Sequence, residues 1–236
     1  MLNLAPNHLD RHGTMAAYQQ AKEVILAHQT PTDTAVLNWD DPIVRQMALC
    51  GQGRRLYYSM QEELDEGVSR HGTTLVLATA GHSTVLCQQS DVRLRGAHNF
   101  GNAAAAAAAA TTLGVTPETI ARGLQRFRAL PHRLELIATK GDVEYYNDSK
   151  ATTPVSTIRA LQAFEQPIVL LAGGYDKGTP FDELGQVIHA RARAVLVYGT
   201  TAPKLALAIA QAAVAAPALP APRAARPTGC PGPTCR

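Results

Sequence analysis

From residue 134 to residue 216 the chain alternates between short apolar segments of strand-forming residues and longer segments with the apolar spacing of a helix. The predicted strands are 134–139, 143–146, 167–172 and 194–198, and the predicted helices are 153–163, 181–190 and 202–216. A turn at 140–142 makes the first two strands a hairpin. The alternation that follows predicts a parallel, Rossmann-like sheet with helices on both faces, which is an α/β fold.

The first part of the chain also predicts an α/β unit, with a mixed or parallel sheet. Eight consecutive alanines, at 103–110, predict a helix without bulky side chains that can pack very close to a sheet. The predicted helices are 14–28, one that begins at Pro42, 101–113 and 116–127, and the predicted strands are 35–38, 54–59, 73–79 and 83–87. The pattern changes after Leu130, so we expect one domain at 1–130 and another at 131–217.

Residues 218–236 differ from the rest of the chain in composition. They contain five of the 15 prolines, one leucine and no aromatic residue, so we expect a disordered tail. Their three arginines account for the whole net charge of +3. The remainder of the chain is neutral, and we expect no nucleic acid partner.

Other general features predict a cytoplasmic location. No apolar run reaches the roughly 20 residues that span a bilayer, and residues 1–4 do not begin a secretory signal. We therefore expect no membrane insertion, and a monomer. Cys50 and Cys87 stand alone, and Cys230 and Cys235 lie in the tail, so free thiols are expected rather than zinc ligands.

Two polar segments follow predicted strands of the second part. Residues 147–152, Asn-Asp-Ser-Lys-Ala-Thr, include Asp148, Lys150 and Thr152 and predict a ligand-binding loop, although Asp148 or Thr152 could simply cap a helix. Residues 171–178 contain a Gly-Gly turn and Lys177. The carboxyl end of a parallel strand is where α/β proteins bind ligands.

Two more candidates lie near the amino terminus. His8 belongs to a histidine-rich segment, 2–12, which is either ordinary surface or a site for a divalent ion or a phosphate. Lys22 is either a solvated lysine or a partly buried one, because small and apolar residues surround it in the sequence. Burial lowers the pKa of a lysine, and a neutral amine can take up CO2 to form a carbamate, an oxygen ligand for Mg²⁺.

Residues 96–102 and 130–135 supply the remaining candidates. Asn99 and Asn102 lie three residues apart at the start of the alanine helix. They either cap the helix or offer the paired donor and acceptor that match adenine. Arg133 either forms an ion pair with Glu135 or binds a phosphate, for which its planar guanidinium is suited.

These segments together resemble the Mur ligases, the family that builds the peptidoglycan stem peptide. In chain order they resemble L-N-[IVL]-x-x-D-H-x-D-R, Y-x-x-A-K, G-x-H-N-x-x-N-A-x-A-A, L-P-H-R-x-E, N-D-S-K-A-T and G-G-x-D-K-G. The N-D-S-K-A-T segment matches the D-glutamate-adding branch completely, and the resemblance covers about residues 1–216. One departure is Asn7, which stands where an aspartate is common.

The resemblance implies a role for each candidate. His8 and Lys22, the latter as a carbamate, would hold Mg²⁺. Asn102, Arg133 and Asp148 would hold ATP, with Asn99 in support. Lys150, Thr152 and Lys177 would face the amino acid, and Lys150 would join His8 and Lys22 as catalytic. The implied reaction is ATP-dependent: it joins D-glutamate to UDP-N-acetylmuramoyl-L-alanine through an acyl phosphate in peptidoglycan precursor synthesis.

The resemblance is incomplete, because no G-x-x-G-K-[ST] phosphate loop occurs in the 236 residues. We therefore expect a fragment that lacks the amino-terminal domain, the phosphate loop and the end of the last domain. The alternative is a non-catalytic nucleotide-binding or regulatory protein derived from the family. A NAD-binding oxidoreductase is not expected, since no G-x-G-x-x-G follows a strand.

We predict that the 236-residue chain by itself lacks ligase activity. A phosphate loop supplies the main ligands of the transferred phosphoryl group, and the sequence does not contain one. The measurement is D-glutamate-dependent phosphate release from ATP in the presence of UDP-N-acetylmuramoyl-L-alanine. Release above a no-enzyme control that disappears in Lys22→Ala would contradict the prediction.

Overall fold

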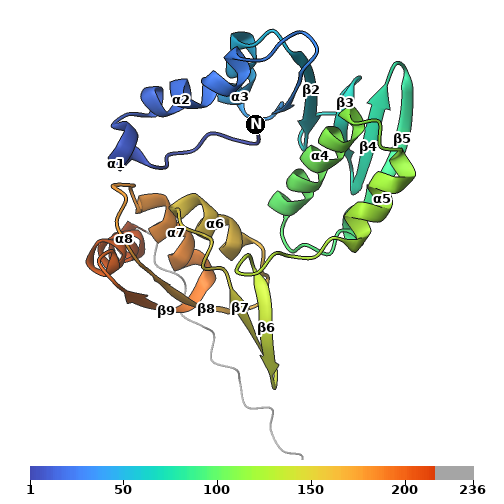
Figure 1. Ribbon diagram of the computed structural model, residues 1–236. Coiled ribbons are helices and arrows are strands. Elements are labelled where there is room, and N and C mark those ends of the chain that lie inside the picture. The colour runs from blue at the N-terminus through green and yellow to red at the C-terminus, as the bar shows by residue number, and fades with distance from the viewer. Residues whose placement is uncertain (216–236) are drawn as a thin grey trace, which may run out of the picture.

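The computed structural model describes residues 1–215, which form two parts joined by the segment between α5 and β6 (Figure 1). The first part, residues 1–130, contains five strands and five α-helices. Its strands are β1 (Thr34–Asn38), β2 (Arg54–Ser59), β3 (Gly67–His71), β4 (Thr74–Thr79) and β5 (His82–Gln88). Its helices are α1 (Leu9–His12), α2 (Met15–Ala27), α3 (Pro42–Met47), α4 (Ala97–Thr112) and α5 (Pro117–Arg126), with the 3-10 turns η1 (Ala48–Cys50) and η2 (Gln89–Asp91).

The five strands of the first part form one mixed sheet in the order β1-β2-β3-β4-β5. Strands β1, β2 and β3 are parallel, and β4 and β5 continue the sheet as an antiparallel hairpin. The turn of that hairpin is Ala80-Gly81, and both residues have positive φ, 48° and 81°. Positive φ at both positions gives the turn the twist that a hairpin favours.

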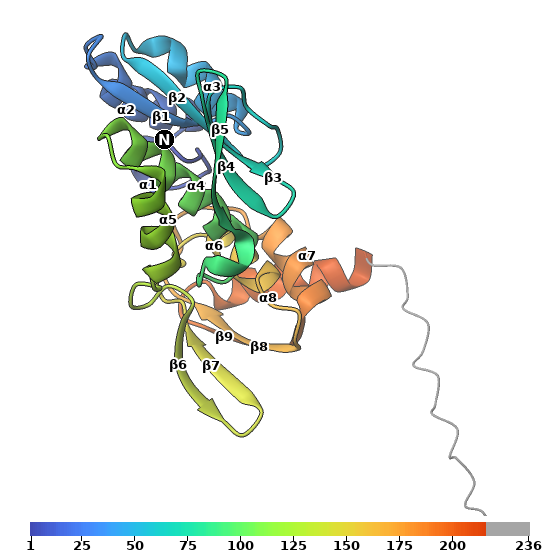
Figure 2. The same ribbon diagram turned by 90° about the vertical axis from the view of Figure 1, so that its right-hand side faces the viewer.

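Helices cover both faces of the β1–β2 end of this sheet. Ala35 and Leu37 of β1 belong to an apolar cluster with residues of α2 and α3. Val36, between them, packs against the cluster that α4 and α5 form on the opposite face. The alternation follows from the pleat of a strand, which points successive side chains to opposite sides. Figure 2 shows α4 and α5 along one face of the sheet.

Helix α4 is the central packing element of the first part. It contacts β1, β2 and β3, and Phe100 and five of its alanines are buried. Ala104 and Ala108 have no exposed surface, while Ala106 on the opposite side of the helix is exposed. Because a methyl group is the largest side chain at these buried positions, the helix axis lies close to the sheet.

The second part, residues 131–215, contains two separate two-stranded sheets. Strands β6 (Glu135–Lys140) and β7 (Val143–Asn147) form an antiparallel hairpin, which projects from the molecule in both views (Figures 1 and 2). Strands β8 (Ile168–Gly173) and β9 (Ala192–Tyr198) are parallel. The helices are α6 (Pro154–Gln162), α7 (Asp182–Arg191) and α8 (Ala202–Ala215).

Among the described residues, α6, α7 and α8 cover only one face of the β8–β9 sheet. Leu170 and Val195 pack with these helices in the third apolar cluster. The intervening side chains, such as Leu171 and Leu196, are exposed on the other face. The predicted helices on both faces are therefore not found in this part.

Local sequence signals predicted most elements correctly. Thr14, Asp41 and Thr116 each accept a backbone hydrogen bond at the start of a helix, as their positions indicated. Strand β3 and the single turn α1 were not predicted. Residues 67–71 carry only one apolar side chain, Val68, so the apolar alternation of a strand is absent there. The predicted disordered tail, 218–236, lies outside the described residues.

Within residues 1–215, every helix is too short or too polar to cross a membrane.

Burial in the core of the first part shifts the pKa of one cysteine. The Cys87 thiol is buried among apolar residues, which raises its pKa to about 11.

We predict that Ala104→Leu destabilises the protein by about 1–3 kcal/mol, because the added atoms have no space between α4 and the sheet. The matched control is Ala106→Leu in the same helix. This exposed substitution should change the free energy of unfolding by no more than about 0.5 kcal/mol. Urea denaturation followed by circular dichroism measures both values, and equal effects would contradict the packing described.

Candidate functional site

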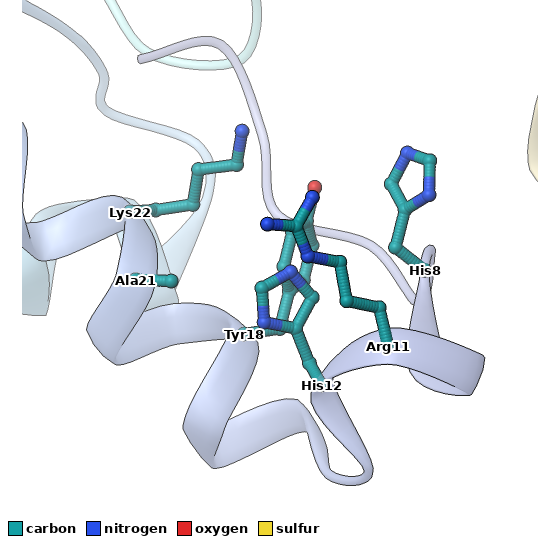
Figure 3. Close-up of a pocket in the computed structure, with 6 residues that line it drawn as sticks. All are labelled: His8, Arg11, His12, Tyr18, Ala21 and Lys22. Atoms are coloured by element: carbon teal, nitrogen blue, oxygen red, sulfur yellow. The ribbon is translucent and has the colours of Figure 1, made fainter.

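A cavity of about 280 Å³ lies between α1 and α2 and brings together two predicted site residues, His8 and Lys22 (Figure 3). Figure 3 shows both side chains projecting to the same side of the helix pair. Its other lining residues are Arg11, His12, Tyr18 and Ala21. His8 has a left-handed backbone, with φ of 54°, and its carbonyl accepts hydrogen bonds from the first turn of α1. This turn directs the histidine toward the cavity.

Basic side chains dominate the cavity, and none of its lining residues is acidic. Lys22 Nζ lies 5.4 Å from the centroid of the Tyr18 ring, and the His12 ring lies 5.1 Å from the same ring. Arginine, lysine and protonated histidine attract anions. As it stands, the cavity is therefore suited to an anionic group.

These residues as they stand do not fit Mg²⁺. Magnesium prefers oxygen ligands in octahedral geometry, and the cavity offers no carboxylate. Within residues 1–215, no group of three or more histidine, cysteine, aspartate or glutamate side chains is placed to hold a metal ion. A carbamate on Lys22 would supply the missing oxygen ligand, so the magnesium site stays a prediction that depends on this modification.

Of the two alternatives for Lys22, the structure shows the solvated lysine and not the partly buried one. Lys22 is exposed on α2, and so is Ala21 beside it. Helix α2 packs against the core through Met15, Tyr18 and the buried Leu26, and Ala21 and Lys22 lie on the part of its surface that faces solvent. Burial, which was our reason to expect a neutral amine, is absent.

Asn99 and Asn102 lie in the first turns of α4 and are joined to each other. Asn102 Nδ2 donates to Asn99 Oδ1 at 3.1 Å, and Asn99 Nδ2 donates to the carbonyl of Arg95 at 2.7 Å. Gly96 is the N-cap, and neither asparagine side chain caps the helix. The capping alternative is thus not found, and the exposed Asn102 keeps its own oxygen available to a ligand.

The segment around Arg133 has an unusual backbone. His132 and Leu134, on either side of Arg133, both have positive φ, 66° and 44°. Their amide groups donate to carboxylates: His132 to Glu135 at 2.7 Å and Leu134 to Asp148 at 3.0 Å. Such conformations are unfavourable for residues with a side chain and are found where the surrounding structure enforces them, often at functional sites. The Arg133 side chain is exposed.

Asp148 joins this segment to the predicted ligand loop. Its Oδ1 accepts from Leu134, and within residues 1–215 its Oδ2 accepts no hydrogen bond. Burial raises the pKa of Asp148, while the Leu134 amide and the positive charge of Arg133 act in the opposite direction. Lys150 is bound through its backbone amide to the His132 carbonyl at 3.1 Å. The side chains of Lys150 and Thr152 are exposed.

Lys177 lies in the loop that follows β8. Gly173 permits this loop, because a Cβ atom there would collide with the backbone oxygen of Tyr198 on β9. The next carbonyl, that of Gly174, accepts from the hydroxyl of Thr200 at 2.8 Å. Asp176, beside Lys177, is held by Lys204 Nζ at 3.1 Å, which lowers the pKa of Asp176. The Lys177 side chain has no salt bridge within residues 1–215 and is partly exposed.

The predicted residues thus form four groups. The structure joins His8 with Lys22, Asn99 with Asn102, and Arg133 with Asp148 and the backbone of Lys150. Thr152 belongs with Lys150, because its backbone amide donates to the Lys150 carbonyl at 2.9 Å. Lys177 stands apart from the other three groups, after the end of β8. Sequence analysis assigned no role to Arg11, Arg95 or Lys204, each of which lies next to one of these groups. Arg11 alone had a signal, because it lies within the same segment as His8.

A second arrangement of reactive residue types is structural. Ser69 Oγ lies 3.0 Å from His71 Nε2, and His71 Nδ1 lies 3.3 Å from Glu63. This is the order of a hydrolase triad. Ser69, however, is fully buried and also accepts from the Leu64 amide, so no substrate carbonyl can reach its hydroxyl. The three residues instead fix the loop between β2 and β3.

Comparison with known protein families identifies both parts of the chain. Residues 1–110 match the Mur ligase middle domain, and residues 132–226 match the Mur ligase glutamate ligase domain. A UDP-N-acetylmuramoylalanine–D-glutamate ligase from Roseiflexus sp. is 44% identical over an alignment of 228 residues that includes 87% of this chain. The ligase of the same name from Pelotomaculum thermopropionicum is 42% identical over 202 residues, or 86% of this chain. The chain spans only 46% and 44% of these two relatives.

Solved structures share the fold. A crystal structure of MurF from Acinetobacter baumannii superposes with a TM-score of 0.71 at 21% identity, over 88% of this chain and 48% of that one. MurF ligase from Thermotoga maritima, in complex with ADP, gives a TM-score of 0.64 at 20% identity, over 86% and 49%. At these identities the likeness establishes an α/β architecture and nothing finer.

We predict that His98 makes the stability of the protein pH-dependent. Burial and the positive charge of Arg159 lower the pKa of His98 below its ordinary value of 6.5. Between the folded and unfolded pKa values the unfolded chain binds more protons, so stability falls as the pH drops through 6.5. Thermal unfolding from pH 7.5 to pH 5.5, in about half-unit steps, should show a smaller loss of Tm in His98→Gln than in the native protein. The exposed His189→Gln is the control, and an equal loss in both variants would contradict the assignment.

Proposed function

Because the chain belongs to the Mur ligase family, we propose that it acts in the ATP-dependent addition of D-glutamate to UDP-N-acetylmuramoyl-L-alanine during peptidoglycan precursor synthesis. The names of its relatives from Roseiflexus and Pelotomaculum support this reaction. The match of residues 132–226 to a glutamate ligase domain supports the amino acid substrate. A cytoplasmic location and a monomeric state remain predictions from the sequence.

The observation that carries the proposal is the hydrogen bond from the Leu134 amide to Asp148. It connects two segments that the sequence marked separately, one with Arg133, which we propose binds the phosphates, and the other with Asp148, which we propose accepts the ribose hydroxyls. The bond holds Arg133 in a strained turn and leaves Oδ2 of Asp148 without a hydrogen bond from residues 1–215. A nucleotide could meet both groups at once, because its ribose and its phosphates lie side by side.

The proposed nucleotide site adds Asn102 to these two residues. Its amide has an unused oxygen and a second N–H group, which together match the donor and acceptor on adenine. Asn99 supports Asn102 by accepting one of its hydrogen bonds. Arg133 would bind the phosphates, since a guanidinium forms paired hydrogen bonds with phosphate oxygens.

Lys150, Thr152 and Lys177 form the proposed site for D-glutamate. The two lysines have no salt bridge within residues 1–215, so their charges are available to the carboxylates of the amino acid. Lys204 contributes indirectly, because it neutralises Asp176 and keeps that carboxylate from pairing with Lys177. Lys150 can also stabilise negative charge that develops during the transfer.

The cavity with His8 and Lys22 has a conditional role in this proposal. Carbamylation first needs the Lys22 ammonium to lose a proton. The neutral nitrogen then bonds to CO2 and loses a second proton, so two protons leave and a positive charge is replaced by a negative one. The neighbouring Arg11 favours this change by Coulomb attraction. A carbamate on Lys22 and the His8 ring would then be the ligands of Mg²⁺, an ion that stabilises phosphoryl charge when bound.

The second candidate, retained from the sequence, is a non-catalytic nucleotide-binding or regulatory protein derived from the family. Binding of ATP is common to both candidates and does not separate them. Binding of D-glutamate does, because a protein that only senses nucleotide has no use for Lys150, Thr152 and Lys177. Isothermal titration with D-glutamate in the presence of ATP should therefore give a signal that Lys177→Ala removes.

We predict that Asn102→Ala weakens ATP binding roughly tenfold to a hundredfold, the effect of losing one paired amide contact to a base. Equilibrium dialysis with radiolabelled ATP and the full 236-residue chain measures the change. Gln125→Ala is the control, since it removes an exposed amide from the neighbouring helix α5. If ATP does not bind, or if Asn102→Ala binds it normally, the proposed nucleotide site is wrong.

A further inference from the structure

Arg95 connects the two parts of the chain. It lies two residues before α4, yet its side chain reaches aromatic residues of the second part. Its guanidinium carbon lies 4.8 Å from the ring centroid of Phe164, just beyond α6, and 5.3 Å from that of Tyr146 on β7.

The aromatic partners of Arg95 form a binding site suited to its planar guanidinium. The rings of Tyr146 and Phe164 are 4.8 Å apart and nearly perpendicular, at 72°. Glu144 accepts a hydrogen bond from the Tyr146 hydroxyl at 2.9 Å and lies 3.7 Å from Arg95 Nη2. A guanidinium can stack on a ring and face a carboxylate at once, whereas an ammonium cannot stack.

The backbone of Arg95 continues the connection toward the proposed nucleotide site. Its carbonyl accepts the hydrogen bond from Asn99 Nδ2, and Asn99 Oδ1 accepts the one from Asn102 Nδ2. Gly96, between Arg95 and α4, has φ of 94°, and a Cβ atom there would lie 3.0 Å from that of Ala163. The chain therefore passes tightly against the second part before it enters the helix.

We propose that Arg95 is a positioning residue that sets the orientation of Asn102 through Asn99 according to how the two parts are docked. Docking of the Arg95 side chain against the rings of Tyr146 and Phe164 fixes the Arg95 carbonyl, and this carbonyl fixes the amide of Asn99. With its amide fixed, Asn99 presents its oxygen to Asn102, which leaves the other face of Asn102 for adenine. Arg95 itself does not touch the nucleotide.

The inference rests on the proposed function for the identity of the ligand. The coupling between docking of the two parts and the orientation of Asn102 does not depend on that function. If docking orients Asn102, then nucleotide binding must strengthen docking by the same factor, since coupling between two sites is reciprocal. Arg95 also differs in kind from the residues that carry the family resemblance. It lies outside the G-x-H-N-x-x-N segment, and only its contacts in the fold reveal it.

A double-mutant cycle with Arg95→Ala, Phe164→Ala and the combined variant tests the coupling in the full chain. The first readout needs no nucleotide: amide hydrogen exchange of residues 97–102, measured by mass spectrometry. Each single variant should raise the exchange rate of these amides. The double variant should exchange at nearly the same rate as either single variant, because both substitutions remove the same contact. Arg93→Ala, an exposed arginine two residues earlier, is the control and should leave the exchange unchanged.

The second readout is ATP affinity by equilibrium dialysis. Arg95→Ala and Phe164→Ala should each weaken ATP binding about tenfold, within the usual range of coupling between sites, and their effects should again not add. Arg95→Lys keeps the charge but loses the stacking plane, so it should behave like Arg95→Ala. A structural role limited to stability would lower Tm without changing either readout.

The two readouts separate failure of this inference from failure of the proposed function. If ATP binds the native chain while Arg95→Ala changes neither exchange nor affinity, the inference is overturned and the nucleotide site stands. Additive effects of the two single variants overturn it as well. If ATP does not bind the native chain, the proposed function is wrong, and so is the predicted effect of Arg95 on ATP affinity. The hydrogen-exchange readout then decides alone whether Arg95 couples the two parts of the chain.

Discussion

The close approach of α4 to the first sheet is the constraint on which the rest of the candidate site depends. Alanines with no exposed surface hold the helix against β1, β2 and β3. A helix fixed along its length also fixes its first turn, so Asn99 and Asn102 keep their place relative to the sheet. The chain before that turn must then pass through Gly96, close to Ala163 of the second part, and this path places Arg95 next to the second part.

Much of the fold follows from local sequence signals. The helix caps at Thr14, Asp41 and Thr116 and the eight alanines define their elements through hydrogen bonds and propensities within a few residues. Strand β3 could not be predicted in this way, because its place in the sheet depends on pairing with β2 and β4 rather than on its own residues. The expected helices on both faces of the β8–β9 sheet failed for a related reason, since alternation along the chain does not say which face each helix covers.

The candidate site shows the same division between local and distant causes. Motif spacing suggested that His8 and Lys22 act together, and both line one cavity. The proximity of Arg133 to Asp148 comes from the fold, because the sequence marked their segments separately. Of the two alternatives for Lys22, the partly buried one was not found, because the neighbours of a residue in sequence do not determine what packs over its helix. Lys204 and Arg95 carried no local signal at all, since each acts on a residue of another element through the fold.

Charge pairing within the protein decides which groups remain for ligands. Three carboxylates near the candidate site are already engaged: Glu135 by a backbone amide, Asp176 by Lys204 and Glu144 by Arg95. Asp148 accepts a hydrogen bond through Oδ1 only. The cations differ, because Lys150 and Lys177 have no salt bridge within residues 1–215 and the cavity of Lys22 contains no acid. A surface that neutralises its acids and leaves its bases free attracts anions. Nucleotide phosphates, a sugar-linked carboxylate and glutamate are all anions. An excess of free cationic side chains therefore suits every substrate of the proposed reaction, but it does not distinguish one substrate from another.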